Sequence, residues 1–484
     1  MRRKKQMQNK PSNGRPGTGR PHPGSSGKPQ RPYGKPETRA SSNANPRLVA
    51  VNVLGDVLEK EAYAALSLDD RLNAVNLNQL DRRLCASIVY RTLENLYTLD
   101  FALSGFLRDA DALALPVRNI LRTGACQILL HDRVPNSAAV NEAVKLTREM
   151  RLDGFSGMVN AVLRRLADHQ AEIRWPEPAE GARYLSVMYS MPEWLAQRLI
   201  ADYGREEAEK IASFRTEKHA ITLRPTFGRE KDFEAALAKK VWTVEPAVLP
   251  GARRVFGAMQ IARDSDYLNG LFSIQGEGSM AAAAAVDVKR GMNVLDCCAA
   301  PGGKTAYMAE RMDGTGRVYA WDLHSHRVEL IRAMTRRLHL ENVRMAARDA
   351  AVLREELTGS MDAVLLDAPC SGLGVMDDKP DVKYRPTAES LAALVETQQR
   401  LLDTCCRYVK PGGVLVYSTC SMLKDENERQ IARFLQAHPD FAIDALPETI
   451  PAALRAQAGM YGLQLLPHRD GVEGFFVARM KRQG

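Results

Sequence analysis

The sequence predicts an α/β protein with a mostly parallel, doubly wound sheet, preceded by an all-α domain and a small α+β region. Three observations lead to this prediction. Strand and helix patterns alternate from residue 286 to residue 484, which is typical of parallel strands joined by right-handed crossovers. Residues 294–309, VLDCCAAPGGKTAYMA, read as a strand, a glycine turn and a helix. Residues 46–170 show a helical apolar period throughout.

The length of 484 residues allows about three domains. We expect a basic arm over 1–45, an all-α domain over 46–170, a linker with a small α+β region over 171–285 and the α/β domain over 286–484. The chain is 45% hydrophobic, but no apolar run approaches the roughly 18 residues of a membrane span. The N-terminus shows no signal-peptide pattern, so we expect a cytoplasmic protein without a membrane segment.

The net charge of +9 is unevenly distributed. Residues 1–47 hold 12 Lys and Arg against one acid, Glu37, a net +11 that leaves −2 for all later residues. The arm is rich in Pro, Gly and Ser and poor in aliphatic residues, which predicts disorder. Such an arm fits contact with RNA or DNA as well as it fits a solubilising tail.

Eight cysteines are present, with no C-x-x-C pair and no metal-ligand spacing. Neither disulfides nor a metal site are therefore expected. Free cysteine is usually a small core residue, so a reactive one needs its own argument.

The all-α region begins with Ala50, Val53, Leu54 and Val57, at the spacing of one helix face. Its later run HDRVPNSAAVNEAVKLTREM, residues 131–150, resembles the helical RNA-binding module of the NusB antitermination family. This resemblance implies docking of RNA or protein, not chemistry.

The later regions divide into strands and helices by their apolar runs. MPEWLAQRLIADYG predicts a helix over 191–204, and ITLRPT and VWTVEP predict short strands. Strands of the α/β domain are expected at 293–296, 317–322, 343–348, 361–367, 413–419, 463–466 and 475–480. Helices are expected to begin near Lys304, Ser325, Ala351, Ala388 and Asp425.

The glycine turn of 294–309 does not fit two familiar nucleotide pockets. A Walker A loop needs glycine at position 298, which is Cys298, and no G-x-G-x-x-G accompanies the strand. Acids instead follow three consecutive predicted strands: Asp322, Asp349 and Asp367. An acid after the second strand suits a ribose diol, and Asp349 suits an adenine amino group. Ribose, adenine and a charged tail together indicate S-adenosylmethionine, although each acid alone also fits a helix cap.

Two cysteines follow neighbouring predicted strands, Cys370 after 361–367 and Cys420 after 413–419. Both sulfurs should lie beside the ligand crevice, where a thiolate is a strong nucleophile. Methylation of pyrimidine carbon 5 requires such a group, because thiolate addition at carbon 6 makes carbon 5 nucleophilic. Methylation of nitrogen or oxygen requires none.

Four motifs are similar to those of the RNA 5-methylcytosine methyltransferases of the NOL1/NOP2/Sun family. They are CAAPGGK (298–304), DAPCSG (367–372), STCS (418–421) with DENE (425–428), and DGVEGFF (470–476). The resemblance implies a Rossmann-like domain that uses S-adenosylmethionine, and the NusB-like module in front of it implies 16S rRNA as the substrate. Where the family usually has Q-D-E-A-S, this chain has QGEGS at 275–279.

The resemblance also implies roles for single residues. Cys420 would be the nucleophile, Cys370 would assist product release, and Lys304 and Asp367 would face the cytosine. The implied donor-binding positions are Cys298, Ala299, Ala300, Pro301, Gly302, Gly303, Lys304, Asp322, Asp349 and Asp367. Cys297 and Cys298 would contribute backbone and packing, not thiol chemistry.

Ribosomal RNA, unassembled or partly assembled, is the expected partner of a monomeric protein without a metal. A tRNA cytosine-C5 methyltransferase and a non-catalytic RNA-binding assembly factor are the alternatives, and the second is disfavoured by the presence of both cysteines. Candidate RNA contacts are Arg164, Arg165, Lys379, Lys383 and Arg385, for which a solvated surface position is the alternative.

Overall fold

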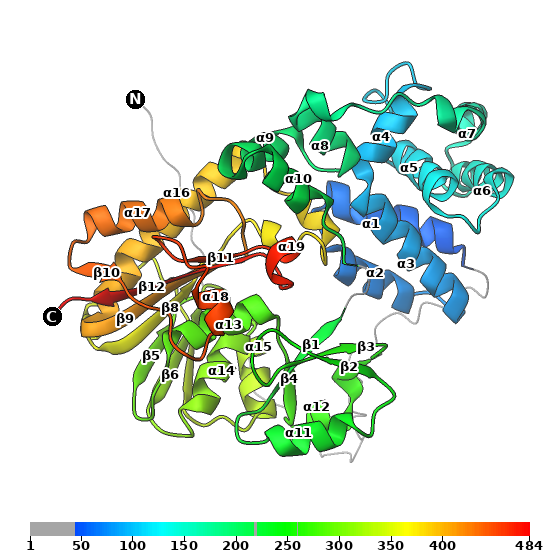
Figure 1. The fold of residues 1–484 in the computed structure, drawn as a ribbon. Coiled ribbons are helices and arrows are strands. Elements are labelled where there is room, and N and C mark those ends of the chain that lie inside the picture. Colours follow the sequence, from blue (N-terminus) through cyan, green and yellow to red (C-terminus); the bar gives the residue numbers. More distant parts are fainter. Residues whose placement is uncertain (1–43, 217–219, 259) are drawn as a thin grey trace, which may run out of the picture.

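The fold is that of a computed structural model, which describes residues 44–216, 220–258 and 260–484. The predicted disorder of the basic arm concerns residues 1–43, which lie outside the described residues. Figure 1 shows a helical part, a small sheet and a large sheet covered by helices. This is the α/β architecture with an all-α domain and a small α+β region that the sequence predicts.

Of the described residues, 46–169 form a bundle of seven α-helices. They are α1 (Pro46–Glu59), α2 (Ala64–Asn73), α3 (Gln79–Glu94), α4 (Leu96–Ser104), α5 (Leu115–Leu130), α6 (Asn136–Glu149) and α7 (Ser156–His169). Asn45 and Asn78 cap α1 and α3 through their side-chain oxygens, and Pro116 lies in the first turn of α5. The apolar face of α1 packs into two cores, one with α2 and α3 and one with α4 to α7.

Three further helices join this bundle to the large sheet: α8 (Ala182–Met188), α9 (Glu193–Tyr203) and α10 (Arg205–Ser213). Their core contains Leu185, Leu195 and Ile211 together with Leu373 and Met422 from the large-sheet part. Helices α8, α9 and α10 therefore pack directly against the loops that carry Cys370 and Cys420, although these loops lie far away in the sequence.

The small sheet has four strands in the order β2-β3-β1-β4. They are β1 (Ile221–Pro225), β2 (Thr243–Pro246), β3 (Arg253–Phe256) and β4 (Phe272–Ile274), with α11 (Glu230–Leu237) and α12 (Ser265–Leu268) beside them. All of the pairings are antiparallel. Phe233 of α11 and Phe272 of β4 are buried in its small core.

The large sheet has eight strands, with the path β10-β12-β9-β8-β5-β6-β7 and with β11 paired to β12. Its parallel strands are β5 (Asn293–Asp296), β6 (Arg317–Asp322), β7 (Val343–Ala347), β8 (Met361–Asp367) and β9 (Val409–Thr419). The antiparallel strands are β10 (Phe441–Ile443), β11 (Leu463–Leu465) and β12 (Phe475–Arg482). The carboxyl ends of the five parallel strands meet at one edge.

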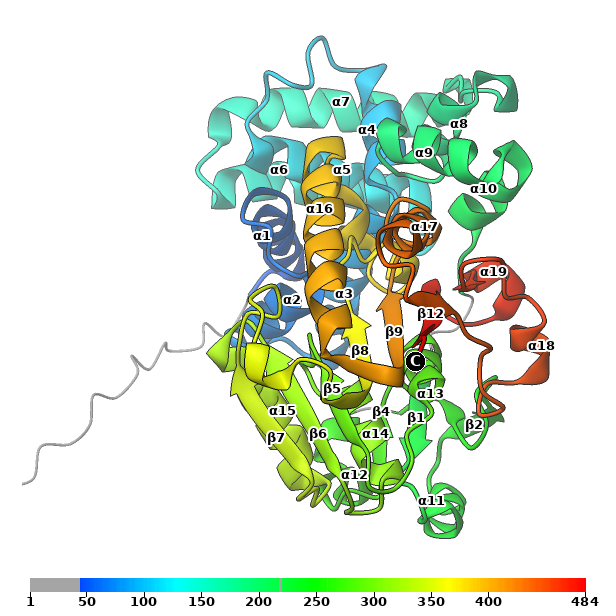
Figure 2. The ribbon, with the colours of Figure 1, turned by 90° about the vertical axis from the view of Figure 1, so that its left-hand side faces the viewer.

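Helices cover both faces of this sheet (Figures 1 and 2). One face carries α13 (Glu277–Val286), α14 (Gly303–Arg311) and α15 (Ser325–Arg337). The other carries α16 (Ala388–Cys405) and α17 (Glu428–Ala437). Short helices α18 (Ala452–Arg455) and α19 (Pro467–Asp470) lie near β11. Successive side chains of a strand point to opposite faces, so Leu365 packs under α13 while Val364 and Leu366 pack under α16.

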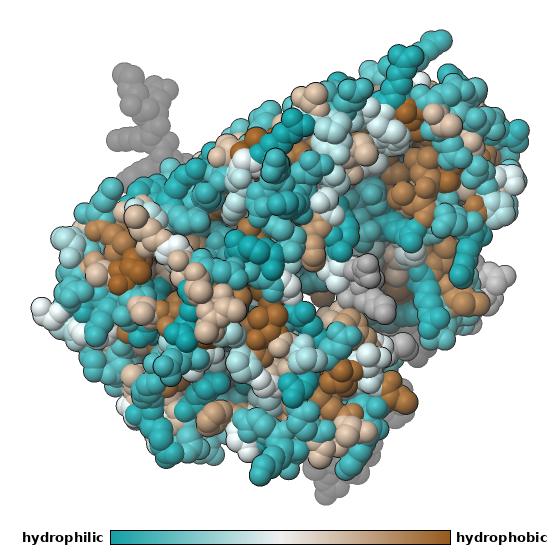
Figure 3. Space-filling model, viewed as in Figure 1, coloured by the Kyte–Doolittle hydropathy of each residue, from teal (hydrophilic) through white to brown (hydrophobic). Residues whose placement is uncertain are grey.

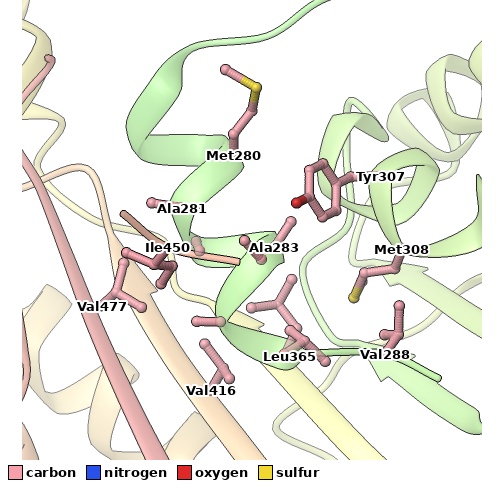
Figure 4. Close-up of a cluster of buried hydrophobic side chains, with 14 of the residues drawn as sticks. Met280, Ala281, Ala283, Val288, Tyr307, Met308, Leu365, Val416, Ile450 and Val477 are labelled. Atoms are coloured by element: carbon pink, nitrogen blue, oxygen red, sulfur yellow. The ribbon is translucent and has the colours of Figure 1, made fainter. Parts of the chain in front are cut away.

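The alanine-rich helix α13 is buried along most of its length. Figure 4 shows Ala281 and Ala283 surrounded by Leu365, Val416 and Val477 of the sheet. Small side chains let the helix approach strands β8, β9 and β12 closely. The helix therefore packs directly against three strands of the large sheet.

One predicted element is wrong. No α-helix begins near Ala351; the chain there turns and forms only a 3-10 turn over Glu355–Leu357. Asp349 accepts the N–H of Ala351 at 2.9 Å, and the Tyr408 hydroxyl accepts the N–H of Arg354 at 2.9 Å. The Arg354 N–H, which a helix would bond to the Ala350 carbonyl, is therefore taken by a side chain from another segment.

Within the described residues, no helix is both long and apolar enough to cross a bilayer. Figure 3 shows a mostly hydrophilic face with scattered hydrophobic patches. The described residues also contain no group of three or more His, Cys, Asp or Glu side chains arranged to hold a metal ion.

Candidate active site

The glycine turn after β5 leads directly into α14. Gly302 has a φ of +110°, in the left-handed region that favours glycine. A Cβ at Gly302 would lie 3.2 Å from the Cα of Ile331, so the turn is packed tightly on α15. The first N–H groups of α14, which starts at Gly303, have no partner within the helix, and this favours an anionic group at the sheet edge.

Asp322 at the end of β6 holds this turn in place. Its carboxylate, which is 2% exposed, accepts the N–H of Ala300 at 3.3 Å and that of His324 at 3.2 Å. Arg327 lies 3.5 Å from the same carboxylate and donates to the Ala300 carbonyl at 3.2 Å. Asp322 therefore lies at the edge of the sheet where its contact with ribose is predicted, and it also shapes the glycine turn.

Asp296 at the end of β5 is the most unusual acid of this edge. Its Oδ2 accepts from the Thr305 hydroxyl at 2.6 Å, whereas its Oδ1 is buried without a partner. Burial raises the pKa of Asp296 to about 7. A buried acceptor without a donor is costly in the free protein, so this atom fits a polar ligand group. Sequence reasoning placed Asp296 at the strand end without giving it a role.

The other predicted donor-binding residues line the same edge. The Ala299 N–H donates to the Trp321 carbonyl at 2.7 Å, which ties the turn to β6. Pro301 lies between Ala300 and Gly302 in this turn and is exposed. Asp349 lies just beyond β7 and is exposed. Burial raises the pKa of both Cys297 and Cys298 well above its usual range, so neither thiol is activated.

Lys304 and Asp367 form an ion pair at the centre of the edge. Lys304 Nζ lies 2.7 Å from Asp367 Oδ2, and Asp367 Oδ1 accepts from the Ser418 hydroxyl at 2.8 Å. Although burial opposes the charge, the Asp367 carboxylate raises the pKa of Lys304. The ammonium also lies 5.3 Å from the centre of the Phe475 ring, which orients it further.

Cys370 and Cys420 face each other across the loops that follow β8 and β9. The two strands are neighbours, and the Sγ atoms lie 3.0 Å apart. The backbone N–H of Cys420 also donates to Cys370 Sγ at 3.2 Å. The hydrogen bond between the two sulfurs lowers the pKa of Cys420 against the effect of burial, and Lys304 acts in the same direction. The same bond, together with burial, raises the pKa of Cys370.

Glu426 connects the two cysteine loops, a role that sequence reasoning missed. Its buried carboxylate accepts the N–H of Ser371 at 2.8 Å, the Ser371 hydroxyl at 2.6 Å and the Gln398 amide at 3.0 Å. It also accepts from the Ser421 hydroxyl. The adjacent Asn427 bonds Thr419 at 2.6 Å. The sequence signal for this role was the DENE motif, which places Glu426 and Asn427 six and seven residues after Cys420. In the structure both side chains are fully buried.

The departure from the usual Q-D-E-A-S motif has a steric counterpart. A Cβ at Gly276 would lie 2.0 Å from Glu473 Oε1, and a Cβ at Gly278 would lie 2.7 Å from Phe475. Glu473 and Phe475 belong to the DGVEGFF motif and flank Gly474, whose N–H donates to Gly374 at 2.8 Å. The two glycines therefore make room for this motif.

The candidate RNA contacts differ in exposure. Arg164, Arg165 and Lys379 are exposed, as a contact residue requires. Lys383 is only 3% exposed and its Nζ lies 3.1 Å from the Glu94 carbonyl, so its assignment as an RNA contact is wrong. Arg385 donates to the carbonyls of Glu61 and Ala62. Both side chains join the large-sheet part to the helical bundle.

A family model described as 16S rRNA methyltransferase RsmB/F matches residues 283–481, and one described as NusB family matches residues 44–168. The fold and these matches define the class: a Rossmann-like methyltransferase domain behind a NusB-like helical domain. The chain is 34% identical over 443 residues to a Bacillus subtilis (strain 168) protein named "Probable ribosomal RNA small subunit methyltransferase B", covering 90% of this chain and 99% of that protein. It belongs to the ribosomal RNA small subunit methyltransferase B family.

Two solved structures share the fold. The crystal structure of PH0851 has a TM-score of 0.75 and 24% identity, over 92% of this chain and 100% of that chain. A methyltransferase homolog protein from Pyrococcus horikoshii has a TM-score of 0.54 and 28% identity, over 63% of this chain and 100% of that chain.

Proposed function

We propose that this methyltransferase acts on carbon 5 of a cytosine in 16S rRNA, with S-adenosylmethionine as methyl donor and a covalent bond between Cys420 and carbon 6 of the base. The observation behind this proposal is the pair of sulfurs 3.0 Å apart, beside the Lys304–Asp367 ion pair at the carboxyl edge of the sheet. Methylation of a nitrogen or oxygen atom would need no thiolate there. The rRNA substrate is supported by the family and by the NusB-like domain.

Cys420 is the better nucleophile of the two cysteines. The hydrogen bond between the two sulfurs lowers the pKa of Cys420 and raises that of Cys370, which fits a Cys370 S–H that donates to a Cys420 thiolate. A thiolate, not a thiol, adds to an electron-poor ring carbon. Lys304 stabilises the thiolate in the free enzyme and suits the negative charge that the ring acquires on addition.

The reaction begins with addition of Cys420 to the ring. The Cys420 electron pair forms the S–C6 bond, and the electrons of the C5–C6 double bond move into the ring and toward N3. The ring electrons return through carbon 5, which forms a bond to the methyl group as the bond between that group and the donor sulfur breaks and its electron pair stays on the sulfur. Carbon 5 then loses its proton to a base. The C5–C6 double bond re-forms as the S–C6 bond breaks, and the electron pair returns to Cys420. The Cys370 S–H stabilises this departing thiolate, which gives Cys370 its role in product release.

S-adenosylmethionine supplies an electrophilic methyl group when it is bound. The residues proposed to hold it are those of the glycine turn, Cys298 to Lys304, and the acids Asp322, Asp349 and Asp367. Asp296, with its buried and unpaired Oδ1, suits a further contact with the donor. The target base must leave its stack to reach Cys420, which favours an RNA loop or an assembly intermediate over a continuous duplex.

The test uses unmodified 16S rRNA and methyl-labelled donor. Cys420→Ala should abolish methyl transfer while donor binding persists, and Cys370→Ala should accumulate a protein–RNA adduct on denaturing gels. Cys406→Ala is the matched control, because Cys406 is a buried thiol at the end of α16. Methyl transfer by Cys420→Ala would refute the nucleophile assignment.

The substrate is tested separately. Bisulfite mapping of rRNA and tRNA from a strain without this protein should show one 16S rRNA cytosine that has lost its modification. Loss confined to tRNA would instead support the tRNA alternative. Unchanged modification of both RNAs would support a non-catalytic assembly factor.

A further inference from the structure

The loop between β8 and α16 connects the active site to the helical bundle. It carries Cys370 near its start and contains the 3-10 turns η6 (Leu373–Val375) and η7 (Pro380–Tyr384). Its last part, residues 380–385, packs against the end of α3. We call residues 380–385 the docking segment.

Three consecutive side chains of the docking segment bond main-chain carbonyls of the N-terminal helices. Lys383 Nζ donates to Glu94 at 3.1 Å, the Tyr384 hydroxyl donates to Leu93 at 2.6 Å, and Arg385 donates to Glu61 at 2.9 Å. Arg385 also bonds the Ala62 carbonyl at 2.8 Å, and its guanidinium lies 4.1 Å from the Tyr63 ring centre.

The acceptors explain why these side chains are needed. Leu93 and Glu94 are the last residues of α3, and the final carbonyls of a helix have no partner within it. Burial lowers the pKa of Lys383 to about 7, and in its charged form the side chain also interacts favourably with the helix dipole. Buried Lys383 and half-buried Tyr384 therefore cap α3 from another domain. The Tyr384 hydroxyl also contacts Ser190, and Lys383 Nζ lies 3.5 Å from the Tyr189 carbonyl, so both side chains connect α3 and the segment after α8 to the loop.

The other end of the loop is bonded to the reactive cysteines. The Gly374 N–H donates to the Cys420 carbonyl at 2.9 Å, and the Ser371 N–H donates to Glu426 at 2.8 Å. Between the two ends, Lys379 N–H donates to Val375 at 2.9 Å and Val382 N–H donates to Lys379 at 3.1 Å. A short series of main-chain bonds thus runs from Cys420 to the docking segment.

We propose that Lys383 and Tyr384 are positioning residues: by anchoring the loop to the end of α3, they hold Cys370 against Cys420, so that the helical bundle controls release of the methylated base. The consequence for release rests on the proposed function. The mechanical part, in which the anchor orders the cysteine end of the loop, does not.

The mechanical part is tested without RNA by amide hydrogen exchange of the full-length protein. Tyr384→Phe keeps the ring that packs on Tyr97 but removes the hydroxyl, and Lys383→Met keeps the buried aliphatic chain but removes the donor. Each change should speed exchange of the Ser371 and Gly374 amides by roughly five-fold, the factor expected for one lost hydrogen bond. Lys379→Met, in an exposed lysine of the same loop, is the control and should change nothing.

Faster exchange confined to residues 380–385 and the end of α3, with Ser371 and Gly374 as in the unchanged protein, would overturn the proposal. Thermal melts identify a variant that has lost its fold, and Tyr384→Phe is conservative enough to serve alone.

Activity then tests the consequence. The double variant should accumulate the RNA adduct and lose turnover, while the KM for S-adenosylmethionine stays unchanged. Turnover lost without any adduct would refute control of release even if exchange responds as expected. If the unchanged protein transfers no methyl group to 16S rRNA, the proposed function fails, and the exchange result still decides the mechanical proposal.

Discussion

Replacement of Cys370 by alanine should raise the pKa of Cys420. In the structure the Cys370 and Cys420 sulfurs lie 3.0 Å apart, and the hydrogen bond between them is the largest influence lowering the pKa of Cys420. Alanine leaves no donor at this position. The Lys304 charge remains, so the thiolate loses one of its two main sources of stabilisation.

The size of the effect follows from one hydrogen bond to a charged acceptor. Such a bond contributes about 1.5–3 kcal/mol, and one pKa unit corresponds to about 1.4 kcal/mol. Because a thiol is a weak donor, we take the lower end, about one unit. Below its pKa, the thiolate fraction of Cys420 should therefore fall roughly tenfold.

Alkylation by iodoacetamide across a pH series, with the Cys420 peptide followed by mass spectrometry, measures this pKa. The thiolate is the reactive form, so the rate rises with pH through the pKa, and the midpoint should move upward in Cys370→Ala. Cys370→Ser retains a donor and should shift less. A midpoint that is unchanged or lower in Cys370→Ala would refute the claim that Cys370 activates Cys420.

Two further predictions concern buried acids. Glu426→Ala should cost several kcal/mol in the free energy of unfolding, because the Ser371 N–H and the Gln398 amide lose their acceptor. Glu426→Gln should cost much less, because the hydroxyls of Ser371 and Ser421 can rotate to accept from its amide. Denaturant titrations compare them, and equal losses would contradict this account of the network. Asp296→Asn should stabilise the free protein at alkaline pH: the raised pKa of about 7 means that wild-type stability is greatest below the ordinary value near 3.8 and falls as the pH rises to about 7. Melting temperatures at pH 5 and pH 8 test this, and a difference between the two proteins that does not grow with pH would count against it.

Much of the fold could be predicted from local pattern. The strands at 293–296, 317–322 and 361–367 match β5, β6 and β8, because each is a short apolar run bounded by turn residues. The helix expected near Ala351 is wrong, because the Tyr408 hydroxyl, 54 residues away from Arg354, takes a backbone N–H there. Strands β3 and β4 were not predicted, since each is only a few residues long and depends on its neighbours.

The candidate active site was also predicted only in part. The residue types after β8 and β9 indicated thiolate chemistry, because parallel strands bring their carboxyl ends to one edge whatever the rest of the chain does. The roles of the acids and cysteines remain predictions. The 3.0 Å separation of the sulfurs, and the direction of each pKa, depend on loop positions that Glu426 fixes across 55 residues of sequence.

The sequence by itself determined the class of fold, the edge at which chemistry occurs and the residue types available there, since hydrophobic period and turn chemistry act over a few residues. Only the tertiary structure decided what Lys383 does. A basic residue in a polar loop is typical of a surface contact. The carbonyl groups that lie next to the Lys383 ammonium group belong to α3 and to the residue after α8, about 290 and 190 residues earlier in the chain. The burial of a side chain depends on which other segments pack against it, and a local sequence pattern does not predict that packing.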